Sequence, residues 1–172
     1  MFPSSTVLRR SLVLWPLLGV AALSGCGSPA MNFNQTIVGA NKQIEQAGRR
    51  FGESLQPVMA GRSGDAARVR ASYNDVKQEF QSVQTNMQAL KVPDLPGAKE
   101  LYDEHQLFLR GQAIMIEGEF AEIVRIVESG GPGQAARIQQ ILQSVGRKEQ
   151  ADLAKLQNAQ RSFATKNNLK LQ

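Results

Sequence analysis

The stretch DAARVRASYNDVKQEFQSVQTNMQAL, residues 65–90, decides the fold class of this chain. Its apolar residues follow one another at alternating steps of four and three, which places them on one side of an α-helix. Asp65 can cap the first turn through its side-chain oxygen, and Ser63 is a second candidate for that cap. The stripe consists of Val69, Tyr73, Val76, Phe80, Val83, Met87 and Leu90. This repeat predicts a long helix that packs against other helices along its length.

The segment before this helix carries the same kind of periodicity. We expect a first helix that begins near Asn32 or Asn34, either of which can act as an N-cap. Its apolar side contains Ile37, Ile44, Phe51 and Leu55. Pro57 limits the helix at about residues 55–60, because proline lacks the amide hydrogen that an interior helical turn needs.

Two more helices are expected after residue 90. Pro93 and Pro96 interrupt the chain, and Asp94 is the expected cap of the third helix. The inward side of the third helix contains Leu101, His105, Phe108, Leu109, Gln112, Ile116, Phe120, Ile123 and Val127. The Gly- and Pro-rich segment 129–133 separates it from a fourth helix over about residues 134–165. The stripe of the fourth contains Ile138, Ile141, Leu142, Val145, Leu153, Leu156 and Phe163, with a more polar midsection at 148–150.

The connections between these helices are short. Links of about five residues place consecutive helices side by side and antiparallel. Alternating strand patterns do not occur in this part of the sequence. The sequence therefore predicts an all-α fold, an up-down-up-down antiparallel four-helix bundle over residues 34–172.

The N-terminal residues have the features of an export signal. Arg9 and Arg10 precede an uncharged apolar run over residues 11–22. This run is shorter than a permanent transmembrane helix normally requires. Leu23-Ser24-Gly25-Cys26 follows, and these four residues resemble the lipobox of bacterial lipoproteins. Cys26 is also the only cysteine of the chain. An ordinary secretory signal cleaved near Gly25, or an uncleaved anchor, is the alternative interpretation.

This resemblance implies that residues 1–25 are a cleaved signal peptide and that Cys26 is lipidated on its sulfur. Residues 26–33 then form the lipidated end and a short tether. The acyl chains hold the protein at the extracytoplasmic side of a membrane, because each buried methylene contributes about 0.8 kcal/mol. Gly27 stands where Asp favours inner-membrane retention in lipoproteins of many Gram-negative bacteria. In a host with two membranes we therefore expect the periplasmic face of the outer membrane.

Charge and composition exclude several classes of function. The chain of 172 residues has a formal net charge of +5, from 20 Lys and Arg and 15 Asp and Glu. Removal of residues 1–25 takes away Arg9 and Arg10, so 18 basic and 15 acidic side chains remain, too small an excess to favour nucleic acid as a partner. One Cys and one His leave no CxxC redox pair, thiolate zinc cluster or multi-histidine metal site. We expect no catalytic residues, metal or cofactor.

We therefore expect a membrane-anchored, non-enzymatic interaction or structural module of the cell envelope. Its partners would be membrane lipid, through acylated Cys26, and another envelope protein or a second copy of the chain. The alternative is a helical bundle that holds a small apolar ligand or haem. The polar groups of that alternative site would be His105, Tyr73 and Tyr102, with Met87 or Met115 as a second haem ligand.

The topology also predicts which end of the bundle faces the membrane. The acylated end and the turn at 91–97 would lie at one pole, and the turns at 60–65 and 129–134 at the opposite one. Lysines near a lipid surface attract anionic headgroups by about 1 kcal/mol each. The lysines expected at the membrane pole are Lys91, Lys99, Lys166 and Lys170.

Overall fold

The computed structural model describes residues 28–62 and 65–170, and these residues form helices and turns without a β-strand. The helices are α1 (Pro29–Ser54), α2 (Gln56–Met59), α3 (Ala66–Gln88), α4 (Ala98–Met115), the π-helix η1 (Ile116–Phe120), α5 (Ala121–Ser129) and α6 (Gln134–Lys166). The all-α prediction is confirmed for the described residues. None of their helices is both long enough and apolar enough to cross a membrane.

The first helix begins earlier than the sequence analysis predicts. Ser28 caps α1, because its hydroxyl oxygen accepts a hydrogen bond from the backbone N–H of Met31 at 3.2 Å, and Pro29 occupies the first helical position. Proline suits that position, where its missing N–H would have no helical acceptor. Asn34, proposed as a cap, lies fully buried inside the helix. Residues 29–33 of the expected tether therefore belong to α1.

The second predicted helix is confirmed as α3. The Asp65 carboxylate accepts a hydrogen bond from the N–H of Arg68 at 3.0 Å, as an N-cap does, while Ser63 lies outside the described residues. Six members of the apolar stripe are buried and the seventh, Leu90, is partly buried against them. Before α3, the chain leaves α1 at Leu55 and forms the short α2 around Pro57, close to the predicted limit.

The third predicted helix is divided by a π-turn. Its residues form α4, η1 and α5 in immediate succession, so the chain continues from Ala98 to Ser129 with one wide turn over Ile116–Phe120. Asp94 does not cap it; the N-cap residue is Gly97, which has a left-handed φ of 79° and makes no side-chain hydrogen bond. A left-handed backbone is accessible to glycine at little cost, so the chain can turn sharply into α4 there.

The last helix, α6, agrees closely with its predicted range of about 134–165. Gly133 stands before it with a φ of 80°. The Gln134 side chain donates a hydrogen bond to the carbonyl oxygen of Ile126 at 2.9 Å, which joins the start of α6 to the end of α5.

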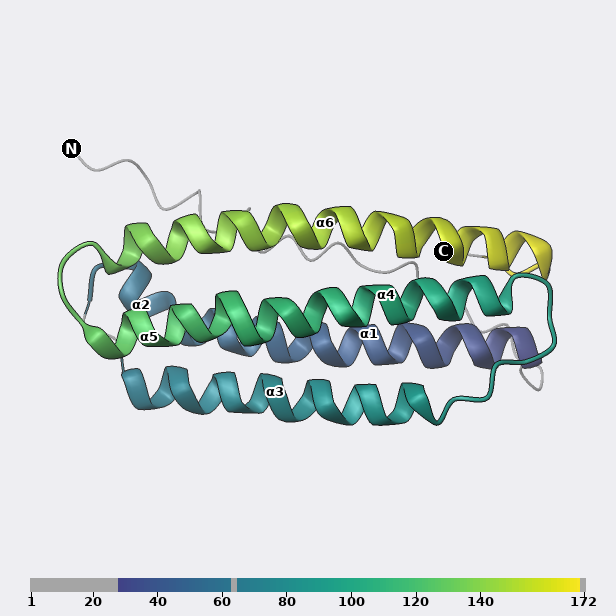
Figure 1. Cartoon of the computed structure of the whole chain (residues 1–172), viewed down its shortest axis with the longest axis horizontal. Coiled ribbons are helices and arrows are strands. Elements are labelled where there is room, and N and C mark those ends of the chain that lie inside the picture. Colours follow the sequence, from purple (N-terminus) through teal and green to yellow (C-terminus); the bar gives the residue numbers. More distant parts are fainter. Residues whose placement is uncertain (1–27, 63–64, 171–172) are drawn as a thin grey trace.

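The long helices run along one axis of the molecule (Figure 1). Helix α1 packs chiefly against α3, and α4 packs chiefly against α6. Aromatic pairs connect these two layers: Phe33 meets Phe163 edge-on at 5.5 Å between ring centroids, and Phe51 stacks on Phe120 at 4.8 Å. The start of α1, the link between α3 and α4, and the end of α6 lie at one end of the molecule (Figure 1).

The two aspartates that were proposed as caps give a test of this fold. We expect Asp65→Ala to lower the free energy of unfolding by about 1 kcal/mol, because the amide of Arg68 loses its acceptor. Asp94→Ala should change it by no more than a few tenths of a kcal/mol, since Asp94 is exposed and is not a cap. Chemical denaturation followed by circular dichroism measures both, and equal losses would contradict the assigned helix starts.

Candidate functional site

The candidate site is a cavity of about 50 Å³ between α1, α6 and the junction of α4 with η1. Its walls come from 14 residues: Ile44, Glu45, Gly48, Phe51, Gly52, Val76, Gln112, Met115, Ile116, Phe120, Leu142, Val145, Gly146 and Glu149. A buried water needs only roughly 10–15 Å³ of such space, so the cavity has room for a small group rather than a single water.

Local sequence explains why the helices leave a space here. Gly48 and Gly52 on α1 and Gly146 on α6 line the cavity without side chains to fill it. A Cβ atom added at Gly48 would meet nothing within 4 Å, so the space beside this glycine is open. The π-turn contributes Ile116 and Phe120 to the cavity wall. Such single wide turns occur frequently at functional sites.

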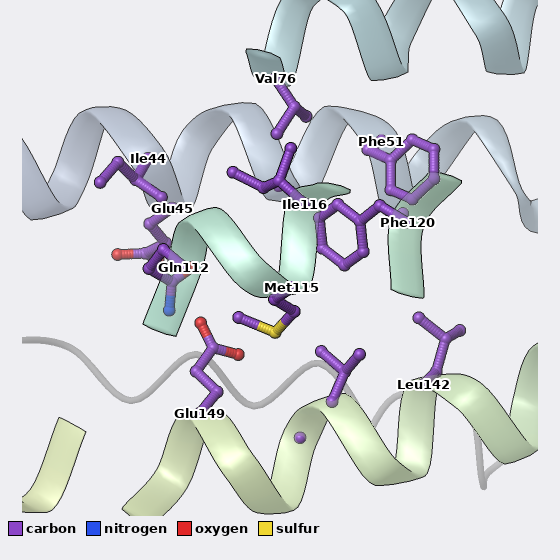
Figure 2. Close-up of a pocket in the computed structure, with 14 residues that line it drawn as sticks. Ile44, Glu45, Phe51, Val76, Gln112, Met115, Ile116, Phe120, Leu142 and Glu149 are labelled. Carbon is purple, nitrogen blue, oxygen red and sulfur yellow. The ribbon is translucent and has the colours of Figure 1, made fainter. Parts of the chain in front are cut away.

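Most of the cavity wall is apolar. Phe51 and Phe120 both line the cavity and stack on each other with their planes 28° apart. Met115 of α4 and Leu142 of α6 continue the apolar wall (Figure 2). Val145 of α6 also lines the cavity. A short hydrocarbon group would lose water and gain dispersion contacts there.

Three polar side chains, each from a different helix, lie together at one side of the cavity. They are Glu45 from α1, Gln112 from α4 and Glu149 from α6 (Figure 2). Gln112 is only 5% exposed, and its side chain lines the cavity. A carboxamide at the wall can donate a hydrogen bond to, or accept one from, a group that enters the cavity.

The two glutamates at the cavity differ in their surroundings. Glu45 forms an ion pair with Arg49 one turn along α1, at 2.9 Å. Glu149 forms no ion pair within the described part of the chain, and burial, with a smaller contribution from the charge of Glu45, raises the pKa of its carboxyl group. The neighbouring Lys148 is paired instead with Glu119. Glu149 can therefore hold a proton or attract a cation at the edge of an apolar space.

The polar residues predicted as ligand contacts do not line this cavity. His105 is fully buried, and its Nε2 donates to Oδ1 of Asn41 at 2.9 Å, not to a carboxylate of residues 103–104 or to a tyrosine. The Tyr102 hydroxyl donates to the carbonyl oxygen of Met87 at 3.1 Å. Tyr73 packs beside Phe51, with ring centroids 6.3 Å apart. The structure therefore does not bring the three predicted polar groups together.

Haem requires more room than the cavity offers. Pockets for ligands of drug size enclose roughly 300–1,000 Å³, well above the space found here. Of the two candidate methionine ligands, Met115 lines the cavity and Met87 does not. The remaining predicted site residue, Cys26, lies outside the described residues.

Two buried polar contacts join α1 to the opposite layer. Besides the contact between Asn41 and His105, the Gln160 side chain donates to Oδ1 of Asn34 at 3.1 Å. Asn34 and Asn41 are seven residues apart, on the same side of α1. Their amide nitrogens, and Nδ1 of His105, have no hydrogen-bond partner among the described residues. The interface between the two helical layers therefore contains two buried polar contacts, about two helical turns apart along α1.

The sequence analysis missed Glu45 and Glu149 as candidate site residues. A signal for Glu149 was present, because steps of four from Val145 to residue 149 and on to Leu153 place this carboxylate within the apolar stripe of α6. Glu45 directly follows the core residue Ile44, and no spacing rule distinguishes it from a solvent-exposed glutamate. Gln112 was correctly placed on the inward side of its helix.

Comparisons of this chain with protein-family models, with curated proteins and with solved structures find no match.

The buried histidine predicts a pH dependence of stability. Burial lowers the pKa of His105 to about 4, from 6.5 for a free histidine. Between these values the unfolded chain binds a proton that the folded chain does not, so the free energy of unfolding falls as pH drops from about 7 to 4, by up to about 3 kcal/mol from this residue.

His105→Gln removes the titration and keeps a donor for Asn41, so we expect a smaller loss of stability in that range for this variant. The opposing contribution of Glu149 is common to both proteins. Denaturation at several pH values measures the difference. The chain has one histidine, so its ring signals in a proton NMR titration give the pKa directly, and a value near 6.5 would refute the prediction.

Proposed function

We propose that this protein is a bacterial lipoprotein, anchored by acylated Cys26 on the extracytoplasmic side of a membrane, that acts as a non-enzymatic helical interaction module. The observation that carries the proposal is the lipobox-like Leu23-Ser24-Gly25-Cys26, placed just before a helical body. In a cell with two membranes, the periplasmic face of the outer membrane is the proposed location.

The start of α1 supports an anchor close to the helices. Only Gly27 and Ser28 separate Cys26 from Pro29, the first residue of α1. The body is proposed to be an up-down-up-down four-helix bundle in which α4, η1 and α5 form one of the four rods. Helix α6 has 33 residues, which at about 1.5 Å per residue gives a rod roughly 50 Å long. One end of this rod would lie at the membrane and the other well away from it.

Lysines near the anchored end support the same orientation. Lys91 lies in the link between α3 and α4, Lys99 in the first turn of α4, and Lys166 at the end of α6, with Lys170 shortly after it. Lys99 and Lys166 are paired with Asp103 and Glu100, which reduces their contribution. Attraction between these lysines and anionic lipid headgroups would strengthen the membrane attachment that the acyl chains provide.

An exposed apolar pair on α4 supports contact with a protein partner. Leu107 is 51% exposed and Ile114 is 70% exposed. They are seven residues apart, so they lie on the same side of the helix. The pair would form part of a contact with another envelope protein or with a second copy of this chain.

A second candidate function is the binding of a small ligand in the bundle. The specific observation in its favour is the cavity beside η1, with the Gln112 carboxamide at its wall. This candidate does not compete with the anchor, because a lipid-anchored bundle can hold a ligand.

The anchor is tested by replacing its sulfur. We expect Cys26→Ser to abolish incorporation of labelled fatty acid, to leave the precursor unprocessed and to reduce recovery in the membrane fraction. Ser24→Ala keeps a small residue in the motif and should be lipidated as the original chain is. Labelling or membrane recovery that is equal in the Cys26→Ser and original proteins would overturn the proposal.

The contact surface is tested by crosslinking in intact cells. A photo-reactive residue at position 114 should give a defined product, whereas the same residue at the exposed Gln81 on α3 should not. The mass of the product distinguishes a second copy from a different protein. Leu107→Lys in the same chain should weaken the product. Equal yields from positions 114 and 81, or no product from either, would count against this surface.

A further inference from the structure

We propose that the cavity between α1, η1 and α6 binds a small organic ammonium ion, with the charged nitrogen beside Glu149, Glu45 and Gln112 and a short hydrocarbon group against Phe51, Phe120 and Met115. This inference names the ligand class of the second candidate function and rests on it. It is independent of the lipid anchor.

The polar side of the cavity fits a cation better than an anion or a neutral molecule. Glu45 and Glu149 both line the cavity, and the charge of each is unfavourable for the other. Arg49 balances Glu45, but no positive side chain of the described residues pairs with Glu149. A positive group placed between them would remove this repulsion and add charge-assisted hydrogen bonds.

Gln112 supplies the neutral contact that an ammonium group needs. Its carboxamide reaches the cavity from α4, opposite Glu149 on α6 (Figure 2). Rotation of the amide can turn its oxygen toward the ligand, where it would accept an N–H hydrogen bond. An ammonium group has up to three such hydrogens, which matches two carboxylates and one amide oxygen.

The apolar side of the cavity sets the size of the ligand and favours an organic cation. Phe51 and Phe120 form a stacked aromatic wall, and the nearby Met115 thioether is not a ligand that sodium, magnesium or calcium prefers. A hydrocarbon group of about three carbons would fill a cavity of about 50 Å³ and bury apolar area against these side chains.

The proposal is tested with propylammonium as the probe on the full-length protein in detergent. Met115 lines the cavity and Met87 does not, so methyl-labelled methionine gives a reporter and an internal control in one NMR spectrum. We expect a saturable shift of the Met115 methyl signal with little change at Met87. At constant ionic strength, propylammonium should bind about tenfold more tightly than 1-propanol, because both can donate a hydrogen bond to Glu149 but only the cation compensates its negative charge.

Variants separate the specific site from general charge. Glu149→Gln should weaken propylammonium binding about tenfold or more, and Glu45→Gln less, since Arg49 already balances Glu45. Glu53→Gln removes the same charge from an exposed position of α1 and should change binding less than twofold. Gly48→Leu fills the open space beside α1 and should abolish the Met115 shift. Circular dichroism checks that each variant is folded.

Each contrary result has a distinct meaning. Equal affinities for 1-propanol and propylammonium would overturn the proposal that the ligand is a cation, and the site would then be an apolar pocket. Competition by sodium or calcium as effective as by propylammonium would replace the organic ligand with an inorganic ion. The absence of any Met115 shift would overturn the second candidate function together with this inference. None of these results alters fatty-acid labelling at Cys26, so failure of the anchor is detected separately.

Discussion

Burial of one apolar stripe along each long helix is the constraint on which the rest of the structure depends. The stripe of α3 cannot be covered by α3 itself, and α1 lies against it over much of its length. The pair of α4 and α6 forms the second layer, and Phe51 on Phe120 and Phe33 on Phe163 join the layers. Helical stability in a domain of this kind comes mainly from such packing rather than from intrinsic propensity.

The core contains buried polar side chains in addition to the apolar stripes. Asn41 with His105 and Asn34 with Gln160 bring polar groups of α1 into contact with α4 and α6. A shift of α1 by one turn would separate both pairs and leave buried amides without partners, at a cost of about 1–3 kcal/mol for each. These contacts therefore favour one register between the layers, as polar core residues do in coiled coils.

The order of the helices and their inward sides could be predicted from the sequence, because periodicity directly reports which residues must be buried. Helix starts were less certain: Asp65 was recognised as a cap, but Asp94 and Asn34 were chosen where Gly97 and Ser28 occupy the N-cap. Each step of four residues along an ideal α-helix turns the side-chain direction by about 40° beyond a full turn. The last of the steps from Phe108 to Phe120 lies in the π-turn, whose wider turn reduces this displacement. The cavity depends on how three helices meet, so Glu149 and Glu45 became recognisable only in three dimensions.

If Cys26 is lipidated as proposed, its short separation from α1 would limit the volume that the protein can reach. The three steps from Cys26 to Pro29 reach roughly 10 Å when fully extended, so under the proposed anchor the start of α1 would stay at the lipid surface. The opposite end of the helical body, roughly 50 Å away, would move parallel to the membrane as the body tilts. The protein would encounter other proteins of the same leaflet by lateral diffusion in two dimensions. A partner held more than roughly 50 Å from the membrane surface could not be reached.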